Sequence, residues 1–350
     1  MTSNNYIVKH TLLIYLYEMS DNSNLNNKVK DIIQKYQQVS IDKSQECFFN
    51  GCKELAIESH VLQKNGIINF IVDNKNHVYE MKHNLFKKPC FYFKYTGFNE
   101  TLKYKGFCNT HDTALFLQIE NKNVDFSDYN TFLLFTYRSM MMERRKKLNV
   151  IHCNDLIMNS HFLNSHIDTS YLRHYNKQTF LGIDDAKYYE EIILNNIIDN
   201  SKKDFSFITL EIPKIEICAS GVYTYETTDE INKIMLNTNK INEPLTEIYF
   251  HLIPQQNKSI VLMGCLNKKK SICWHYIKSH LYYSPETLLK KISDLLLRNI
   301  ETWACSSNFY TTRIKPHERK ILNITNYALD SNDERSDLPF NLFDNIVYKK

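Results

Sequence analysis

The amino-acid sequence predicts an α+β fold with an antiparallel sheet, and three observations support this class. Several segments carry apolar residues at helical spacing. Runs in which apolar and polar residues alternate, as in strands, gather between residues 205 and 266. Hydrophobic residues make up 43% and charged residues 23% of the chain, values that exclude a disordered protein and a membrane-embedded bundle. We therefore expect helices around one antiparallel sheet.

The first expected unit, residues 1–44, is a helical segment. Residues 7–19 are rich in apolar side chains, and residues 25–38 carry apolar side chains at helical spacing. A polar stretch over 20–24 separates them and predicts a turn. We therefore expect two short helices before the first cysteine.

The second expected unit, residues 45–150, is a metal-binding module followed by a long helix. Residues 45–120 hold four cysteines, four histidines and four of the seven glycines. Residues 129–149 predict one helix, whose apolar first half gives way to the basic run Glu143–Lys147. Basic residues in a last turn suit the helix dipole. With Arg138, this run is expected to be either a solvated helix end or a surface that contacts phosphates.

The third expected unit, residues 151–350, is an α+β domain. Two strand-like runs, 246–253 and 259–266, flank Pro254–Lys258 and predict a hairpin. Ser284 can cap a helix that has Pro285 in its first turn and extends to about Trp303. The other expected elements are a helix over 184–200, strands over 205–212 and 222–225, and an exposed turn at Lys268–Lys270 between strands.

The cellular compartment can be predicted from net charge, cysteine content and hydropathy. The formal net charge of +4 permits nucleic-acid binding without requiring it. The nine cysteines do not form the framework of a small disulfide-rich domain, so we expect reduced thiols. The apolar run Thr11–Tyr17 is much shorter than the roughly 20 residues of a membrane span, and it lacks the features of a signal peptide. These observations predict a cytoplasmic protein with no membrane segment.

Two short-spaced pairs predict a metal site. The first is Cys47-x4-Cys52, and the second, far downstream, is Cys108-x2-His111. Zinc favours four soft or borderline ligands in a tetrahedron, which two such pairs can supply from separate turns. Gly51 lies inside the first pair and Gly106 precedes the second, where tight turns need glycine. We expect a structural Zn²⁺ held by Cys47, Cys52, Cys108 and His111.

Other ligand sets stay open. His77, His83 and Cys90 lie between the two pairs and could replace a ligand or form a second site. The alternative is that these three are surface or partly packed side chains. Cys273, His275 and His280 in the C-terminal half also suggest a site, but no carboxylate partner is fixed by their spacing.

The sequence around these pairs resembles the treble-clef, or ββα-metal, module of HNH (His-Me finger) endonucleases. The resemblance rests on Cys47-x4-Cys52, Ser59-His60-Val61-Leu62-Gln63 and Phe107-Cys108-Asn109-Thr110-His111-Asp112, and covers residues 45–120. The same context looks like uncharacterised bacterial proteins that carry such a module. The family's middle asparagine has no single counterpart in this Asn-rich stretch.

The resemblance implies catalytic roles for two residues. His60 matches the family's general base, which activates water for attack on a phosphodiester, and an imidazole suits this role because its pKa lies near neutrality. Asp112 matches the position that binds a catalytic divalent ion, here Mg²⁺ or Mn²⁺. The alternative for His60 is a structural role, as a zinc ligand or a core residue, and for Asp112 it is the orientation of His111.

Two functions from different classes follow. One is a zinc-stabilised, HNH-like nuclease that acts on DNA or RNA, with a C-terminal domain that recognises a target or protein partner; a role in bacterial defence follows only by analogy. The other is a zinc-dependent binding or scaffold protein without catalysis. A subunit that is active only in a complex is a third possibility. The state of His60, free or bound to zinc, distinguishes the first two.

Overall fold

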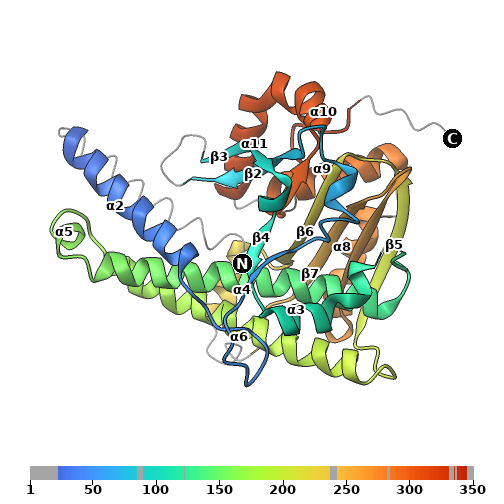
Figure 1. Ribbon diagram of the computed structural model, residues 1–350, viewed down its shortest axis with the longest axis horizontal. Helices are drawn as coiled ribbons and strands as arrows, with labels where there is room; N and C mark the ends of the chain where they lie inside the picture. The colour runs from blue at the N-terminus through green and yellow to red at the C-terminus, as the bar shows by residue number, and fades with distance from the viewer. Residues whose placement is uncertain are drawn as a thin grey trace.

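The fold is built around a seven-stranded antiparallel sheet (Figure 1), in a computed structural model that describes residues 23–84, 90–121, 123–236, 243–281, 284–330, 335 and 337–344. Every neighbouring pair of strands is antiparallel. In spatial order the strands are β3 (Phe91–Gly97), β2 (His77–His83), β9 (Trp303–Cys305), β6 (Ile217–Thr224), β7 (Glu247–Pro254), β8 (Lys258–Leu266) and β5 (Phe205–Pro213). The predicted α+β class with an antiparallel sheet is confirmed.

The sheet draws strands from both sides of residue 150. β2 and β3 come from the segment between the two ligand pairs, and β2 pairs with β9 near the C-terminus through Tyr79 opposite Cys305. No strand was expected over residues 77–97, because the place of this segment in the sheet depends on long-range pairing. The division at residue 150 stays a prediction.

Both faces of the sheet are covered by helices. α4 (Tyr129–Met158) and α6 (Ser170–Ile198) lie on one face, and α8 (Lys270–Leu281), α9 (Pro285–Arg298) and α11 (Glu318–Asp330) lie on the other (Figure 1). The central strands are therefore buried on both sides: Phe250 and Leu252 of β7 face α8 and α9, whereas Tyr249 faces α4 and α6. This explains why β7 and β8 carry nearly continuous apolar runs.

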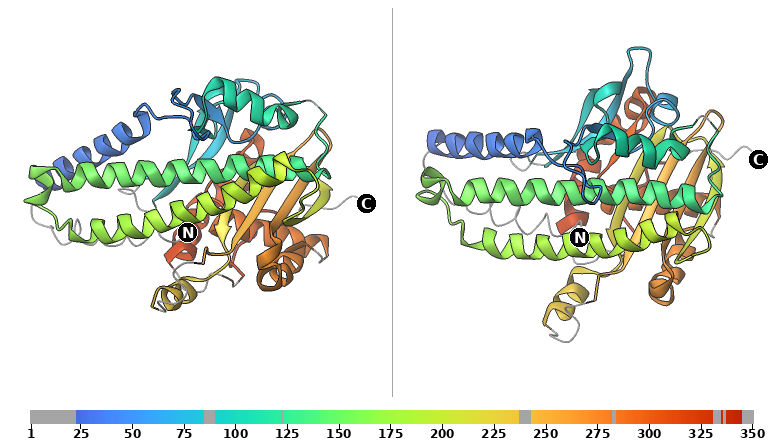
Figure 2. Two further views of the ribbon diagram at one scale, coloured as in Figure 1. Left: turned by 90° about the horizontal axis from the view of Figure 1, so that it is seen from below. Right: turned by 60° about the horizontal axis from the view of Figure 1, so that its bottom comes forward.

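A helical arm extends from the sheet. α4 and α6 run side by side beyond it, and α2 (Ser23–Asp42) packs along α4 (Figure 2). A separate apolar cluster, which includes Val29, Cys153, Leu163 and Leu172, holds these helices and α5 (His161–Asn164) together. The described part of the chain contains no helix with the length and apolar character of a membrane span.

Several sequence expectations are confirmed, and others change at their ends. The helix over 25–38 is α2, and the 246–266 hairpin is β7–β8. The expected helix over 7–19 lies outside the described residues. α6 begins at Ser170 rather than 184, and α9 ends at Arg298, so Trp303 lies in β9. The turn expected at Lys268–Lys270 leads into a helix rather than a strand, because α8 follows it directly.

A second, two-stranded sheet supports the predicted metal site. It pairs β1 (Glu58–His60) with β4 (Lys103–Lys105), in antiparallel register with Ser59 opposite Tyr104. α3 (Asn109–Phe116) follows β4 after three residues. The remaining described α-helices are α7 (Thr228–Leu236) and α10 (Ser307–Phe309).

Candidate metal centre and neighbouring polar site

The first ligand pair lies in a tight backbone turn. The Cys47 amide donates to the Glu54 carbonyl at 2.9 Å, and the Cys52 amide donates to the Phe49 carbonyl at 3.0 Å. Gly51 has φ of +78°, a conformation that costs glycine nothing and other residues about a kilocalorie or more. The turn therefore brings both thiols to one side of the chain, as the Asn50-Gly51 pair predicted.

The second pair lies at the beginning of α3. Cys108 directly precedes the helix, and its carbonyl accepts from the Asp112 amide at 2.9 Å. His111 belongs to the first turn of the helix, and its ring stacks on Phe49 with centroids 3.9 Å apart. This stacking fixes the imidazole beside the first pair.

Backbone hydrogen bonds join the two pairs. The Phe48 amide donates to the Gly106 carbonyl at 2.9 Å, and the Ile57 amide donates to the Phe107 carbonyl at 2.8 Å. Together with the β1–β4 pairing, these bonds bring residues 47–52 against the beginning of α3. The long gap between Cys52 and Cys108 therefore does not separate the ligands in space.

The four predicted ligands form one cluster. All their candidate ligand atoms lie within 4.8 Å of one another. Cys52 Sγ is 3.9 Å from Cys108 Sγ, and His111 Nδ1 is 3.5 Å from Cys47 Sγ and 3.2 Å from Cys108 Sγ. Tetrahedral zinc with bonds of about 2.3 Å to sulfur and about 2.0 Å to nitrogen places such atoms roughly 3.5–3.8 Å apart. The cluster therefore fits a metal ion such as zinc in both ligand type and spacing.

The two buried thiols of the cluster differ in their electrostatics. The backbone amide of His111, at the helix N-terminus, lowers the pKa of Cys108 because it donates to the thiolate. Burial raises the pKa of Cys47. A metal ion would favour the thiolate form of both, because the deprotonated sulfur is the ligand.

Helix α4 anchors the first pair through Phe48 and two arginines. The guanidinium of Arg145 lies 4.0 Å from the Phe48 ring centroid, and that of Arg144 lies 4.6 Å from it. Arg145 also donates to the Glu46 carbonyl at 3.0 Å and to the carbonyl of Lys105. The turn that carries Cys47 is thus tied to a long, buried helix.

These contacts correct the interpretation of the basic run. α4 continues to Met158, so Arg144–Lys147 lie in the middle of the helix and not in its last turn. Arg144 pairs with Glu190 at 2.6 Å, and Lys146 pairs with Glu143 at 2.8 Å. The run is thus not a solvated helix end, and Arg144, Arg145 and Lys146 are not free to bind phosphate, because each binds groups of the protein.

His60 and Asp112 lie beside the cluster, on neighbouring elements. His60 ends β1, opposite Lys103 of β4, and Asp112 lies in the first turn of α3 next to His111. His60 is not among the clustered ligands, and its Nε2 is buried without a hydrogen-bond partner in the described part of the chain. The two residues are close enough for the charge on His60 to lower the pKa of Asp112.

Burial dominates the electrostatics of this pair. It lowers the pKa of His60, and the positive charges of Lys64 and Lys103 lower it further. It raises the pKa of Asp112 despite the opposing effect of Arg138. His60 is therefore neutral at neutral pH, with an unpaired ring nitrogen.

Arg138 and Glu120 complete the polar site, and sequence reasoning did not place them there. Arg138 is 1% exposed, and its Nη2 lies 3.6 Å from Asp112 Oδ2. Its Nη1 donates to Glu120. Its guanidinium also stacks over Phe116, 4.1 Å from the ring centroid. No spacing rule links Glu120 to Asp112, because both residues meet Arg138 of α4 only in the folded chain.

The alternative ligands lie elsewhere. His77 stacks on Tyr95 with centroids 4.5 Å apart and contacts the Lys75 carbonyl through Nδ1 at 2.7 Å, whereas the Cys90 thiol donates to Asn326. His83 ends strand β2, away from the clustered ligands. Within the described ranges, no second group of three metal-ligating side chains comes together.

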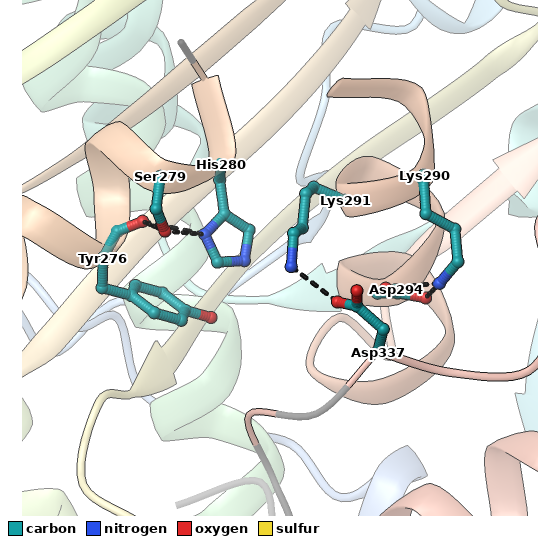
Figure 3. A network of polar contacts seen from close by, with 7 residues as sticks. All are labelled: Tyr276, Ser279, His280, Lys290, Lys291, Asp294 and Asp337. Carbon is teal, nitrogen blue, oxygen red and sulfur yellow. Dashed lines mark hydrogen bonds and ion pairs between the residues drawn. The ribbon is translucent and has the colours of Figure 1, made fainter. Parts of the chain in front are cut away.

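His280, one of the candidate residues of the C-terminal half, belongs to a structural network (Figure 3). His280 Nδ1 lies 2.8 Å from the Tyr276 carbonyl, and burial lowers the pKa of His280 to about 4. Nearby, Lys291 donates to Asp337 at 2.6 Å and Lys290 pairs with Asp294. The contacts of His280 stay within α8 and that of Lys290 stays within α9, whereas Lys291–Asp337 joins α9 to residues 337–344, so we assign the group to packing.

Comparisons with known proteins give no family for this chain. No family model matches it, and no curated protein sequence or solved structure is significantly similar to it.

Proposed function

We propose that the Cys47–Cys52–Cys108–His111 cluster binds zinc and that the adjoining His60–Asp112 site belongs to an HNH-like nuclease. The order of elements carries this proposal. A two-cysteine turn, strand β1 ending in His60, strand β4 and helix α3 with two ligands at its beginning follow one another, as a treble-clef (ββα-metal) module requires. β2 and β3 are then an insertion between the two strands of that module.

The chemistry proposed for this site is the hydrolysis of a phosphodiester in DNA or RNA. His60 Nε2 would accept a proton from water as the water oxygen bonds to phosphorus, and the bond from phosphorus to the leaving sugar oxygen would break. The leaving oxygen would take a proton from solvent. Asp112 would offer a carboxylate to a divalent ion such as Mg²⁺ or Mn²⁺, which would polarise the phosphate. The neutral state of His60, caused by its burial, suits a base.

Access to the site supports the same proposal. Asp112 and Glu120 keep 19% and 38% of their side chains exposed, so the polar site reaches the surface. Arg138 would add positive charge beside a bound phosphate, where a guanidinium is an effective partner. A substrate phosphate could therefore approach Asp112 and Glu120 from solvent, whereas the buried Nε2 of His60 would have to be uncovered before it could act on water.

The test is a cleavage assay with zinc-loaded protein. Wild type, His60→Ala and His161→Ala would be incubated with plasmid DNA, single-stranded DNA and RNA, each with Mg²⁺ or Mn²⁺. Loss of a general base typically costs 10²- to 10⁴-fold in rate, so we expect at least a 100-fold loss for His60→Ala. His161 is an exposed histidine of α5, and its variant should cleave as wild type does. Equal cleavage by all three proteins would reject the assignment.

One observation favours a second candidate function, a zinc-dependent binding module without catalysis. Asp112 forms an ion pair with buried Arg138, and a carboxylate that holds a guanidinium is less available to a divalent cation. In this case the wild type would bind zinc but cleave none of the three substrates. The cytoplasmic location, a protein partner for the C-terminal half and a role in defence stay predictions.

A further inference from the structure

A cavity of about 380 Å³ lies between the helical arm and the main sheet. One wall is apolar and is formed by helices α2, α4 and α6, which run together in Figure 2. The opposite wall comes from β2 and from the residues that precede β9. Ligand pockets of this size commonly combine an apolar lining with a few polar groups. The apolar lining includes Ile33, Ile41, Met142, Val150, Ile157 and Leu172.

A buried carboxylate lines the same cavity. The side chain of Glu80, on β2, is only 5% exposed. Its Oε1 accepts from Lys82, but its Oε2 has no hydrogen-bond partner among the residues that the structure describes. A buried carboxylate oxygen without a donor is costly, because it has lost water and gained nothing in exchange. The cavity therefore contains one strong acceptor that a bound donor would satisfy.

The lysines that line the cavity already have partners. Lys146 donates to Glu143 and to the Thr302 hydroxyl, each at 2.8 Å. Lys103 pairs with Glu100 at 3.1 Å and with Glu58. Burial opposes the charge of Lys146, but attraction by Glu143, Glu301 and, more weakly, Glu80 raises its pKa, so it stays protonated, with its hydrogen bonds going to Glu143 and Thr302. The polar end of the cavity thus offers an acceptor and leaves these two lysines engaged elsewhere.

We propose that this cavity binds a small, mainly apolar molecule that carries a protonated amine, with the amine donating to Glu80 Oε2. The apolar body would lie against α2 and α4, and the cation would complete the hydrogen bonding of the carboxylate. An alcohol could make a weaker contact, and a carboxylate at the same place would be repelled by Glu80. This proposal does not depend on nuclease activity, because none of the clustered metal ligands lines the cavity.

The proposal predicts an order of affinity among three probes of equal chain length. The probes are decylamine, decanol and decanoate, each titrated into the full chain below its aggregation concentration. Isothermal titration calorimetry or native mass spectrometry would measure binding. Hydrogen bonds to charged groups are stronger than neutral ones, so we expect decylamine to bind about tenfold tighter than decanol. Decanoate should bind weakest of the three. Equal binding of all three probes, or binding of none, would overturn the proposal.

Two variants and a control locate the binding. Glu80→Gln should weaken decylamine about tenfold, to the level of decanol, and leave decanol nearly unchanged. Val150→Phe, which places a larger side chain in the cavity, should weaken both amine and alcohol. Glu211→Gln removes a carboxylate that is 64% exposed on β5, and it should alter neither affinity. Circular dichroism would show that each variant is folded, and an amine preference that survives Glu80→Gln would reject the site.

Discussion

Cys52 and Cys108 are 56 positions apart in the sequence, yet their sulfur atoms lie 3.9 Å apart. The residues between them leave the small β1–β4 sheet, supply β2 and β3 to the main sheet, and return. Metal binding would therefore close a long loop, and loop closure restricts the unfolded chain more as the loop lengthens. A bound metal would in this way couple the stability of the metal centre to that of the edge of the main sheet.

Zinc content is the first prediction. Wild type purified without chelator should carry about one zinc per chain, and Cys108→Ala should carry close to none, because three remaining ligands bind zinc far more weakly. His60→Ala should keep its zinc, because His60 lies outside the cluster. Elemental analysis of the three proteins by mass spectrometry gives the ratio directly.

Each result has a distinct consequence for the site. Zinc loss in His60→Ala, with a native circular dichroism spectrum, would make His60 a ligand and would remove it as a free base. A metal-free wild type that takes up no added zinc would contradict the proposed centre. His161→Ala serves as the control for a general effect of removing a histidine.

Packing at Gly264 gives the second prediction. A Cβ atom there would lie 2.6 Å from the Ser206 carbonyl oxygen, 2.7 Å from Phe132 Cζ and 2.8 Å from Phe207 Cβ. The Phe132 and Phe207 rings stack with centroids 4.5 Å apart, so they have little room to move. Gly264→Ala should lower the free energy of unfolding by about 1–3 kcal/mol, measured by urea denaturation.

Gly97→Ala is the matched control for this substitution. The nearest atom to its added Cβ would be His77 Nε2 at 3.7 Å, an ordinary contact. Its free energy of unfolding should change by less than about 1 kcal/mol, the usual range for Gly→Ala at a compatible position. Equal effects at the two glycines would show that α4 packs less tightly on β8 than the structure indicates.

Local signals were enough to predict several parts of the fold. Ser284 caps α9 as expected, because its hydroxyl accepts from the Thr287 amide at 3.4 Å. The metal cluster followed from two short spacings and from glycine at the first turn, where Gly51 has positive φ. These features depend on neighbouring residues, which a single sequence displays directly.

Features that depend on distant packing could not be predicted in this way. We interpreted Arg138 as part of an exposed basic run. It instead contacts Asp112, Phe116 and Glu120, because α3 packs on α4. The helix that begins after Ser284 was expected to extend to Trp303. Trp303 instead lies in β9, which completes the sheet between β2 and β6. In both cases the deciding partner is far away in the sequence and leaves no local pattern.

His251 lies at the centre of a buried polar network on β7. Its Nδ1 is 2.9 Å from the Ser220 hydroxyl, and its Nε2 is 3.4 Å from the Thr136 hydroxyl. Burial lowers the pKa of His251 to about 3, so the native protein holds it neutral. The unfolded chain, with a histidine pKa of about 6.5, binds this proton at a higher pH. The stability from neutral His251 is therefore present above about pH 6.5 and is lost as the pH falls toward 3.

The third prediction is the pH dependence that this histidine causes. Between pH 6 and pH 5, His251 should cost the wild type about 1.2 kcal/mol of unfolding free energy, as linkage gives for an unfolded pKa near 6.5. His251→Asn, which can still bond to Ser220, should lose less over the same interval by about that amount. Burial raises the pKa of Glu247 to about 7, so Glu247 increases the free energy of unfolding as the pH falls. This contribution is the same in both proteins and cancels in the comparison. Urea denaturation at the two pH values measures both slopes, and identical slopes would mean that His251 takes up its proton in the native core over the same pH range as in the unfolded chain.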